Sequence, residues 1–213
     1  MQKFNLFIVI AIMATLFFTS CEPKEPSGND NTPEKIGVEI NGVVWSPYNV
    51  GETPLTFTNT PEEYGGYYQW NKGTSDFMLY DVYEASSFYN ATSWLPQNDP
   101  SPKGWRVPTR DEFYSLYDDD IKHEWTTENG IKGRRFTDTI SGNSIFLPAA
   151  GYRDDESNLL LDVEMYGCYW TSTGFKFEEY IATGANALYF NAYGVMIVDP
   201  TKATGLSVRP VAK

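Results

Sequence analysis

Histidine and cysteine are nearly absent from this chain, which has one histidine and two cysteines among its 213 residues. With His123 as its only histidine, the chain excludes a metal site built from several histidines. A histidine-dependent catalytic triad is equally disfavoured, because His123 follows Lys122 just beyond an expected helix, at an ordinary exposed position. The pair Gly65-Gly66 lies between aromatic residues and does not form a glycine-rich phosphate loop. We therefore predict no catalytic residues, no metal and no cofactor, and hence a protein that is not an enzyme.

Basic side chains are also scarce, since 16 Lys and Arg stand against 28 Asp and Glu and the formal net charge is −12. A surface this acidic repels the phosphates of nucleic acid, so no nucleic-acid partner is expected. It also disfavours an electrostatic hold on anionic lipid. Any attachment to a membrane must therefore come from another feature of the chain.

Long hydrophobic runs are confined to the N-terminus, where residues 4–18 are almost uninterrupted apolar side chains. The run follows the basic Lys3 and precedes two small residues at 19–20. It is shorter than the ~20 residues that a helix needs to cross a bilayer core. A buried core helix is the alternative, but no polar residues mark a second face. The layout is typical of a secretory signal peptide, which we predict at residues 1–20.

The predicted signal peptide is followed by a cysteine. The stretch LFFTSC at 16–21 resembles the lipobox of bacterial lipoproteins. The resemblance implies that Cys21 becomes a lipidated N-terminus, and acyl chains hold a protein on a membrane because each buried methylene contributes ~0.8 kcal/mol. Residues 21–36 are rich in Pro, Glu, Asn, Gly and Ser, which predicts a flexible tether. We expect a cell-envelope location as an outer-membrane lipoprotein, periplasmic or surface-exposed, with the membrane as partner through this lipid.

Cys168 is then left without a second cysteine, so no intrachain disulfide is expected. A single thiol in an exported protein is usually buried. The aromatic neighbours Tyr169 and Trp170 favour that interpretation over a reactive cysteine.

The remaining residues, 37–213, are long enough for one domain with a hydrophobic core. The pair Asn41-Gly42 lies between two β-rich runs and is typical of a hairpin turn, because both of its positions need positive φ. Further predicted strands are residues 67–70, 134–137, 143–147, 187–190, 195–198 and 206–209, with hairpin turns at 141–142 and 193–194.

One helix is well marked in the sequence. Thr109 and Glu112 have the spacing of a capping box, and apolar residues then recur at helical spacing. The acidic run at 118–120 is expected to mark the end of this helix, because the helix dipole disfavours acidic residues there. A weaker helical stretch is expected at about residues 81–90. Strands outnumber helices, so the predicted class is α+β.

Six blocks of the domain have an order and spacing that carry a family resemblance. They include GWRVPT at 104–109 and FLPAAGYR at 146–153, and the full set is 39–51, 61–70, 98–109, 146–153, 169–173 and 207–211. Over about residues 38–211 they resemble the Fibrobacter succinogenes major paralogous domain, a family similar to the C-type lectin-like superfamily. The resemblance implies a C-type lectin-like fold of short antiparallel strands and hairpins, one or two helices and long loops. Relatives often have cysteines where Ser101 and Pro210 stand, so a disulfide implied for them is missing here.

The resemblance also implies a place for ligand binding, because C-type lectin-like folds build their binding surface from late loops and strands. Tyrosine and asparagine suit such a surface, since they combine rigid amphipathic area with adaptable hydrogen bonding. The candidate ligand-binding residues are Tyr180, Asn186, Tyr189, Asn191 and Tyr193, with Trp94 in a loop as a further aromatic platform. The alternative is that Tyr189, Asn191 and Tyr193 are simply one face of a strand.

The remaining chemistry favours recognition over catalysis. Acidic runs at 118–120 and 154–156 offer oxygen ligands for calcium, but solvated loops explain them better. Formylglycine-generating relatives of the superfamily use a pair of cysteines, which Cys168 alone does not supply. We therefore predict a non-enzymatic, membrane-anchored lipoprotein that displays a C-type lectin-like domain for ligand binding or adhesion, with a glycan or a protein as ligand. The alternative is a structural or tip component of a fimbrial or cell-envelope assembly.

Overall fold

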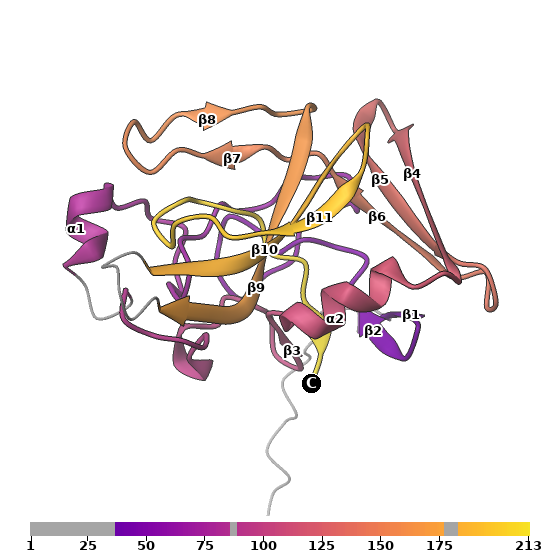
Figure 1. Ribbon diagram of the computed structural model, residues 1–213, viewed down its shortest axis with the longest axis horizontal. Coiled ribbons are helices and arrows are strands. Elements are labelled where there is room, and N and C mark those ends of the chain that lie inside the picture. Colours follow the sequence, from indigo (N-terminus) through magenta and orange to yellow (C-terminus); the bar gives the residue numbers. More distant parts are fainter. Residues whose placement is uncertain (1–36, 86–88, 177–182) are drawn as a thin grey trace, which may run out of the picture. The chain divides into compact units, whose positions relative to one another are not determined.

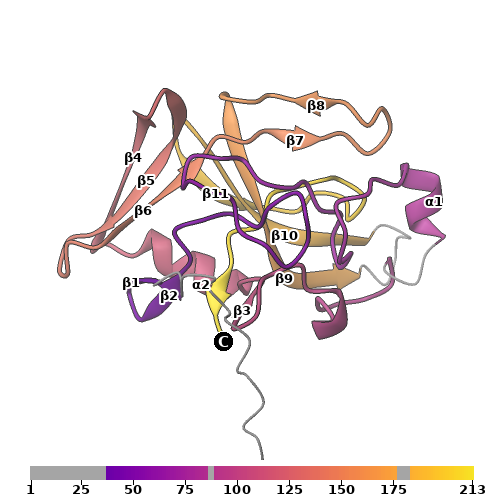
Figure 2. The same cartoon turned by 180° about the vertical axis from the view of Figure 1, so that it is seen from behind.

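The computed structural model describes residues 37–85, 89–176 and 183–213. The chain divides into two units, residues 1–34 and 35–213, and every described residue belongs to the second unit. Figures 1 and 2 show this second unit from opposite sides.

Several sequence predictions fall on other parts of the chain. The signal peptide at 1–20, the lipidation site Cys21, the tether at 21–36 and the candidate ligand-binding residue Tyr180 lie outside the described residues. Among the residues that the structure describes, no helix is both long enough and apolar enough to span a membrane.

Short strands joined by long loops dominate the described part of the chain. The strands are β1 (Val38–Ile40), β2 (Val43–Trp45), β3 (Trp105–Arg106), β4 (Ile121–Glu128), β5 (Ile131–Asp138), β6 (Ser144–Pro148), β7 (Tyr152–Arg153), β8 (Leu160–Leu161), β9 (Tyr166–Lys176), β10 (Thr183–Asn191), β11 (Val195–Val198) and β12 (Val211–Ala212). The helical segments are α1 (Tyr80–Glu84), η1 (Pro96–Asn98), α2 (Arg110–Tyr114) and η2 (Ser115–Tyr117). α1 begins one residue before the weaker helical stretch that the sequence predicts and ends at Glu84, and residues 86–88 of that stretch lie outside the described residues.

The strands form several small antiparallel sheets (Figures 1 and 2). The largest has the order β1-β2-β12-β3, two three-stranded sheets have the orders β11-β10-β9 and β4-β5-β6, and β7 pairs with β8. Because β12 lies between β2 and β3, the first and last strands of the domain belong to one sheet. The helix α2 packs against β9 and β10. The predicted predominance of short antiparallel strands, with a few short helices, is confirmed.

Three predicted hairpins are confirmed. β1 and β2 pair across Asn41-Gly42, whose φ angles of 48° and 76° are those that a tight hairpin turn requires. β5 pairs with β6, and β10 pairs with β11, across the predicted turns. Turn chemistry acts within a few residues, and for that reason the sequence locates these elements well.

Two other predicted strands, residues 67–70 and 206–209, are wrong as regular strands. They meet in a single antiparallel bridge, in which Tyr68 and Leu206 exchange backbone hydrogen bonds of 2.8 and 2.9 Å. A second isolated bridge joins Ser207 to β9 in parallel. Both segments are largely buried, and a short run rich in aromatic or β-branched residues predicts burial without predicting a regular ladder.

β4 and β9 are strands that the sequence analysis did not identify. β9 has 11 residues, and its central part is buried on both faces, so it lacks the apolar-polar alternation of a half-exposed strand. β4 contains His123, for which the sequence predicts an exposed position beyond the helix. His123 pairs with Phe136 of β5, and its side chain is exposed as predicted.

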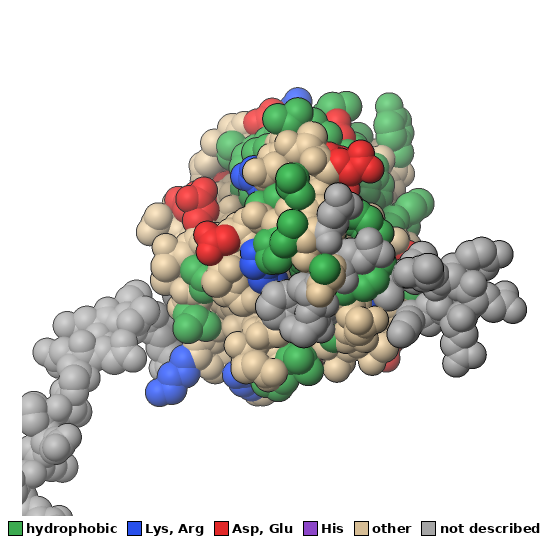
Figure 3. All heavy atoms as spheres, turned by 90° about the vertical axis from the view of Figure 1, so that its left-hand side faces the viewer, with side chains coloured by type: hydrophobic (Ala, Val, Ile, Leu, Met, Phe, Trp, Pro, Cys, Tyr) green, Lys and Arg blue, Asp and Glu red, His purple; other side chains and the backbone are tan. Residues whose placement is uncertain are grey.

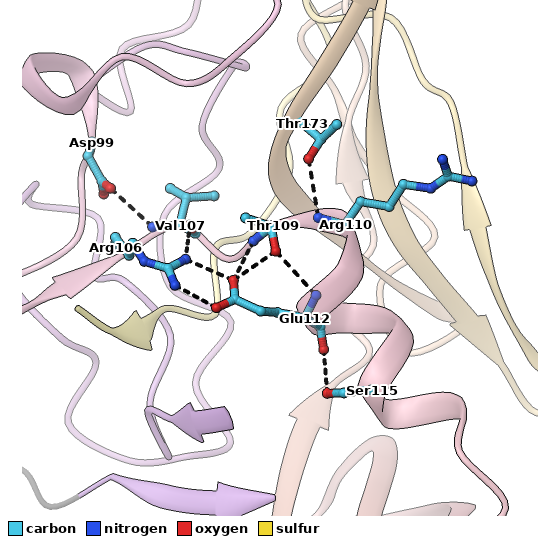
Figure 4. A network of polar contacts seen from close by, with 8 residues as sticks. All are labelled: Asp99, Arg106, Val107, Thr109, Arg110, Glu112, Ser115 and Thr173. Atoms are coloured by element: carbon cyan, nitrogen blue, oxygen red, sulfur yellow. Dashed lines mark hydrogen bonds and ion pairs between the residues drawn. The ribbon is translucent and has the colours of Figure 1, made fainter. Parts of the chain in front are cut away.

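The predicted helix begins at its capping box (Figure 4). The side chain of Thr109 accepts the backbone N–H of Glu112 at 3.2 Å, and the Glu112 carboxylate accepts the backbone N–H of Thr109 at 2.7 Å. Arg106 donates two further bonds to this carboxylate, at 2.8 and 2.5 Å. Burial alone would raise the pKa of Glu112, but the bonds from Arg106 and Thr109 lower it below its ordinary value. The helical segment ends at Tyr117, directly before the acidic run at 118–120, as predicted.

The sheet of β9 and β10 carries hydrophobic packing on both faces. Successive strand residues point to opposite sides, so Tyr169 and Leu188 enter one core cluster while Cys168, Trp170 and Ala187 enter another. The prediction that Cys168 is buried and unpaired is confirmed. Burial raises the pKa of its thiol to about 12, and a neutral buried thiol is a poor nucleophile.

Arg209 is fully buried and joins segments that are far apart in the sequence. Its Nε donates to Oδ1 of Asn49 at 2.8 Å, and its terminal nitrogens donate to the backbone oxygens of Ser46 at 3.2 Å and Phe146 at 3.0 Å. Burial lowers the pKa of Arg209 to about 10. This arginine is therefore a hydrogen-bonding centre of the scaffold, because it joins the segment before β12 to the loop after β2 and to β6.

Candidate functional site

Trp94 and Asn186, two of the predicted ligand-binding residues, lie in the interior of the domain. Trp94 is only 7% exposed, and its indole N–H donates to the backbone oxygen of Asn98 at 2.8 Å. The ring centroids of Trp94 and Trp70 are 5.7 Å apart within the core. Asn186 is buried at a bulge of β10, where its amide donates to Asp199 at 2.5 Å. Trp94 therefore does not provide the expected aromatic platform, and Asn186 supports the β10 bulge.

Tyr189 and Asn191 share one face of β10, and the structure adds two tyrosines from other strands to them. Tyr166 of β9 lies directly opposite Asn191, and Met196 of β11 lies directly opposite Tyr189. Residues that are directly opposite in neighbouring strands present their side chains on the same face. Tyr152 of β7 stacks on Tyr166. We call Tyr152, Tyr166 and Tyr189 the tyrosine row.

The rings of the tyrosine row are held in fixed mutual positions. The centroids of Tyr152 and Tyr166 are 6.2 Å apart with an interplanar angle of 12°, and those of Tyr166 and Tyr189 are 5.1 Å apart at 47°. These separations are typical of favourable aromatic pairs. All three side chains are partly exposed, so the row presents aromatic surface to solvent. Met196 is 54% exposed on the same face.

Polar side chains orient the hydroxyl groups of the row. The amide of Asn191 donates to the Tyr189 hydroxyl at 3.0 Å, and the Tyr166 hydroxyl donates to the carboxylate of Asp162. Burial, followed by this hydrogen bond, raises the pKa of Tyr166. Burial, followed by the negative charge of Asp162, raises the pKa of Tyr152. Both of these hydroxyls therefore stay protonated at physiological pH.

Arg134 of β5 fixes the end of β10 that carries the row. Its Nη2 donates to the backbone oxygen of Asn191 at 2.5 Å, and its Nη1 lies 2.8 Å from Nδ1 of His123. The histidine nitrogen accepts from the guanidinium in this arrangement, which requires a neutral imidazole with Nδ1 unprotonated. Burial, and then the charge of Arg134, lowers the pKa of His123 and favours that neutral form.

Tyr193 lies in the turn between β10 and β11 and is 98% exposed. The side-chain oxygen of Asn191 accepts the backbone N–H groups of Tyr193 at 2.8 Å and Gly194 at 3.2 Å. Asn191 thus bonds both the turn and Tyr189. Of the predicted residues, Tyr189 and Asn191 come together, while Tyr193 occupies the adjoining turn.

Comparison of the chain with protein-family models, curated proteins and solved structures finds no match. What the site can do therefore follows from its own chemistry. The tyrosine row supplies aromatic surface and neutral hydroxyl groups, and Asn191 adds one amide. These groups suit non-covalent recognition.

Tyr152, Tyr166 and Met196 are not among the site residues predicted from the sequence. One signal was available, because Tyr166, Cys168 and Trp170 alternate along β9 and indicate a common strand face. No sequence pattern joins Tyr152 to this face, since its contact with Tyr166 connects two different sheets.

The acidic runs bond within their own loops and to nearby side chains. Within the described ranges, no three His, Cys, Asp or Glu residues are grouped as a metal site would require. The carboxylate of Asp118 accepts from the amide of Asn41. Asp154 accepts the backbone N–H and the hydroxyl of Ser157, at 2.7 and 2.6 Å. These bonds give the carboxylates a role in turn formation.

Proposed function

We propose that this chain is a non-enzymatic, membrane-anchored lipoprotein that binds a glycan through the tyrosine row. In this proposal Cys21 carries the lipid, and the protein resides in the cell envelope at the outer membrane, periplasmic or surface-exposed. The domain has a C-type lectin-like fold of the Fibrobacter succinogenes major paralogous type. The lipobox-like stretch at 16–21 and the six sequence blocks support these parts of the proposal.

The tyrosine row is the observation that supports ligand binding in this proposal. Apolar C–H faces of sugar rings pack well on aromatic rings, while hydroxyl and amide groups at the ring edges bond sugar hydroxyls. Tyr166 and Tyr189 supply such rings, and their hydroxyls lie beside Asp162 and Asn191. The rings come from three different strands, and rigid elements of this kind lower the entropy cost of binding.

The same groups favour binding over catalysis. General acid-base catalysis needs a group with a pKa near the working pH. The pKa of Tyr166 is raised, and the imidazole of His123 is engaged by Arg134. The Cys168 thiol is buried with a raised pKa. Neither His123 nor Cys168 is therefore available as a catalytic group, and Tyr166 supplies ring surface and a hydrogen-bonding hydroxyl.

A glycan array tests the proposal, with the full chain applied in a non-ionic detergent. We expect saturable binding to at least one glycan class, and Tyr189→Ala should weaken it about tenfold, as the loss of a central aromatic contact does. Tyr114→Ala is the matched control, because Tyr114 is an exposed tyrosine of α2 at a different place on the domain. Thermal unfolding of each variant checks the fold. Absence of binding to every glycan, or equal loss in both variants, would refute the proposal.

A second candidate function is a structural or tip component of an envelope assembly. Its support is exposed apolar surface, since Leu79 is 51%, Val82 56% and Leu159 60% exposed. Tyr80 of α1 donates its backbone N–H to the oxygen of Asp155 at 3.0 Å, so α1 adjoins the β7–β8 turn. Figure 3 shows hydrophobic and acidic side chains exposed together on the side of the domain that carries these elements. Exposed apolar surface of this kind is typical of protein contacts.

Cross-linking in intact cell envelopes separates the two candidates. A structural role predicts one reproducible protein partner, whose cross-link Leu159→Asp abolishes and Tyr189→Ala leaves unchanged. Glycan recognition predicts that Tyr189→Ala weakens binding in the glycan array and that Leu159→Asp leaves this binding unchanged. Leu159→Asp leaves the core intact because Leu159 is exposed.

A further inference from the structure

A cleft of about 490 Å³ lies between the loop of residues 51–67 and the β7–β8 hairpin. Cavities of roughly 300–1,000 Å³ are typical of small-molecule sites. Tyr152 and Arg153 are successive residues of β7 and therefore point to opposite sides. Tyr152 belongs to the tyrosine row, whereas Arg153 lies over the ring of Tyr67, and Tyr67 lines the cleft. The cleft and the row are thus separate sites.

The loop that forms the cleft is held open by its own backbone. Gly51 donates its N–H to the oxygen of Thr56 at 2.9 Å, and Gly66 donates to the oxygen of Val50 at 3.0 Å. The buried hydroxyl of Tyr68 donates to the oxygen of Gly51 at 2.6 Å. These bonds fix both ends of the loop, so a ligand finds the cleft already formed and its ordering costs little.

The lining of the cleft is aromatic and acidic. Its walls carry the rings of Phe57, Tyr64 and Tyr67 and the carboxylates of Glu52 and Glu63, and no Lys, Arg or His is among the lining residues. Ring faces and carboxylates both attract cations. The net charge of −12 adds a general attraction of the same sign. An anionic ligand would meet two carboxylates, because the nearby guanidinium of Arg153 lies on the Tyr67 ring and is not among the lining residues.

Two contacts describe the lining of the cleft: a cation lies on one of its rings, and a backbone hydrogen bond orients one of its carboxylates. The guanidinium of Arg153 lies 5.7 Å from the ring centroid of Tyr67, so this ring already accepts a cation. One oxygen of the Glu63 carboxylate accepts the backbone N–H of Asn59 at 3.1 Å. This bond orients the carboxylate, and carboxylate oxygens retain further lone pairs for a ligand.

We propose that the cleft binds a small organic cation, an ammonium group carried on an alkyl chain. Glu52, Glu63 and the ring of Tyr64 attract the ammonium group, and the alkyl chain packs against Phe57 and Leu160. The inference goes beyond the glycan-binding function, because it concerns another surface and another ligand class.

Nuclear magnetic resonance titration of the full chain in a non-ionic detergent tests this inference, with pentylammonium as probe. We expect saturable shifts of the backbone amide signals of Tyr64 and Tyr67. The uncharged pentanol should produce much smaller shifts, and raising the ionic strength should weaken pentylammonium binding. In Glu52→Gln/Glu63→Gln the affinity should fall about tenfold, since the charge attraction is lost.

Three controls make the result decisive. Glu39→Gln removes an exposed carboxylate of β1 and should leave the affinity unchanged. Tyr189→Ala should also leave it unchanged, so a failure of glycan binding does not affect this test. Thermal unfolding confirms that each variant is folded. Equal binding of pentanol and pentylammonium, binding of hexanoate, no saturable shift, or full affinity in Glu52→Gln/Glu63→Gln would each overturn the inference.

Discussion

Arg134 donates a hydrogen bond of 2.5 Å to the backbone oxygen of Asn191, and through it a strand of one small sheet holds the end of a strand in another. The side chain of Asn191 then bonds the hydroxyl of Tyr189 at 3.0 Å. Arg134 is only 4% exposed, so it is enclosed by the domain. The position of the tyrosine row therefore depends on a residue that a ligand on the row need not touch.

Replacement of this arginine should destabilise the domain. Arg134→Gln should lower the free energy of unfolding by about 2 kcal/mol, because it removes a charged donor from a partly buried carbonyl. Urea denaturation measures this change. Arg110→Gln is the control, since Arg110 bonds the exposed Tyr114 hydroxyl and its loss should cost less than about 0.5 kcal/mol. Equal losses in the two variants would contradict the role assigned to Arg134.

The contact between Arg134 and His123 predicts a pH dependence of stability. The folded state lowers the pKa of His123, whereas the unfolded chain titrates near its ordinary value of about 6.5. The unfolded state therefore binds more protons as the pH falls below that value, and the free energy of unfolding decreases. The stabilising contribution is complete above about pH 6.5 and is lost towards acid pH.

The variant His123→Gln isolates this contribution from the carboxylates, because glutamine can still accept from Arg134 but does not titrate. Urea denaturation between about pH 8 and about pH 5 should show a steeper loss of stability for the parent chain. Parallel curves for the two proteins would show that the His123 pKa is not lowered by folding.

Two glycines with nearly equal φ angles should respond differently to substitution. Gly42 has φ 76° and Gly65 has φ 75°, so alanine strains the backbone similarly at both. A Cβ atom at Gly42 meets open space, whereas at Gly65 it would lie 2.1 Å from the oxygen of Val50. We expect Gly42→Ala to cost about 1 kcal/mol of unfolding free energy and Gly65→Ala at least about 3 kcal/mol. Similar costs would mean that the loop beside the cleft is not tightly packed.

Cys168 should be unreactive until the domain unfolds. Its burial and its pKa of about 12 leave almost no thiolate at neutral pH, and thiolate is the reacting form. An aromatic disulfide reagent added to the folded chain should leave Cys168 unmodified, and the same reagent in urea should modify it rapidly. Peptide mass spectrometry distinguishes Cys168 from Cys21. Rapid modification in the folded chain would contradict its burial.

Local chemistry explains which predictions of structure succeed. The Asn41-Gly42 turn and the capping box of Thr109 and Glu112 depend on residues only a few positions apart, and both are confirmed. Residues 67–70 are mostly aromatic and largely buried, but whether a buried segment joins a ladder depends on distant partners. That dependence also explains why β9 was not identified, because burial on both faces removes its alternating pattern.

The residues of the candidate site show the same difference between what local sequence predicts and what distant contacts decide. Residue type and position in the chain were enough to select Tyr189 and Asn191, which lie on one strand face. Trp94 has the residue type of a binding platform, yet its packing against Trp70 places it in the core. Tyr152 joins the row only through its stacking on Tyr166.

The sequence by itself determined the acidic charge, the absence of a cysteine pair within the domain, the tight turns and the helix cap. These properties follow from composition or from neighbours in the chain. The tertiary structure alone decided which tyrosines face one another, which tryptophans are buried, and that Arg209 bonds Asn49, Ser46 and Phe146. The reason is physical: the burial and partners of a side chain are set by contacts between segments far apart in sequence, and short-range patterns do not contain them.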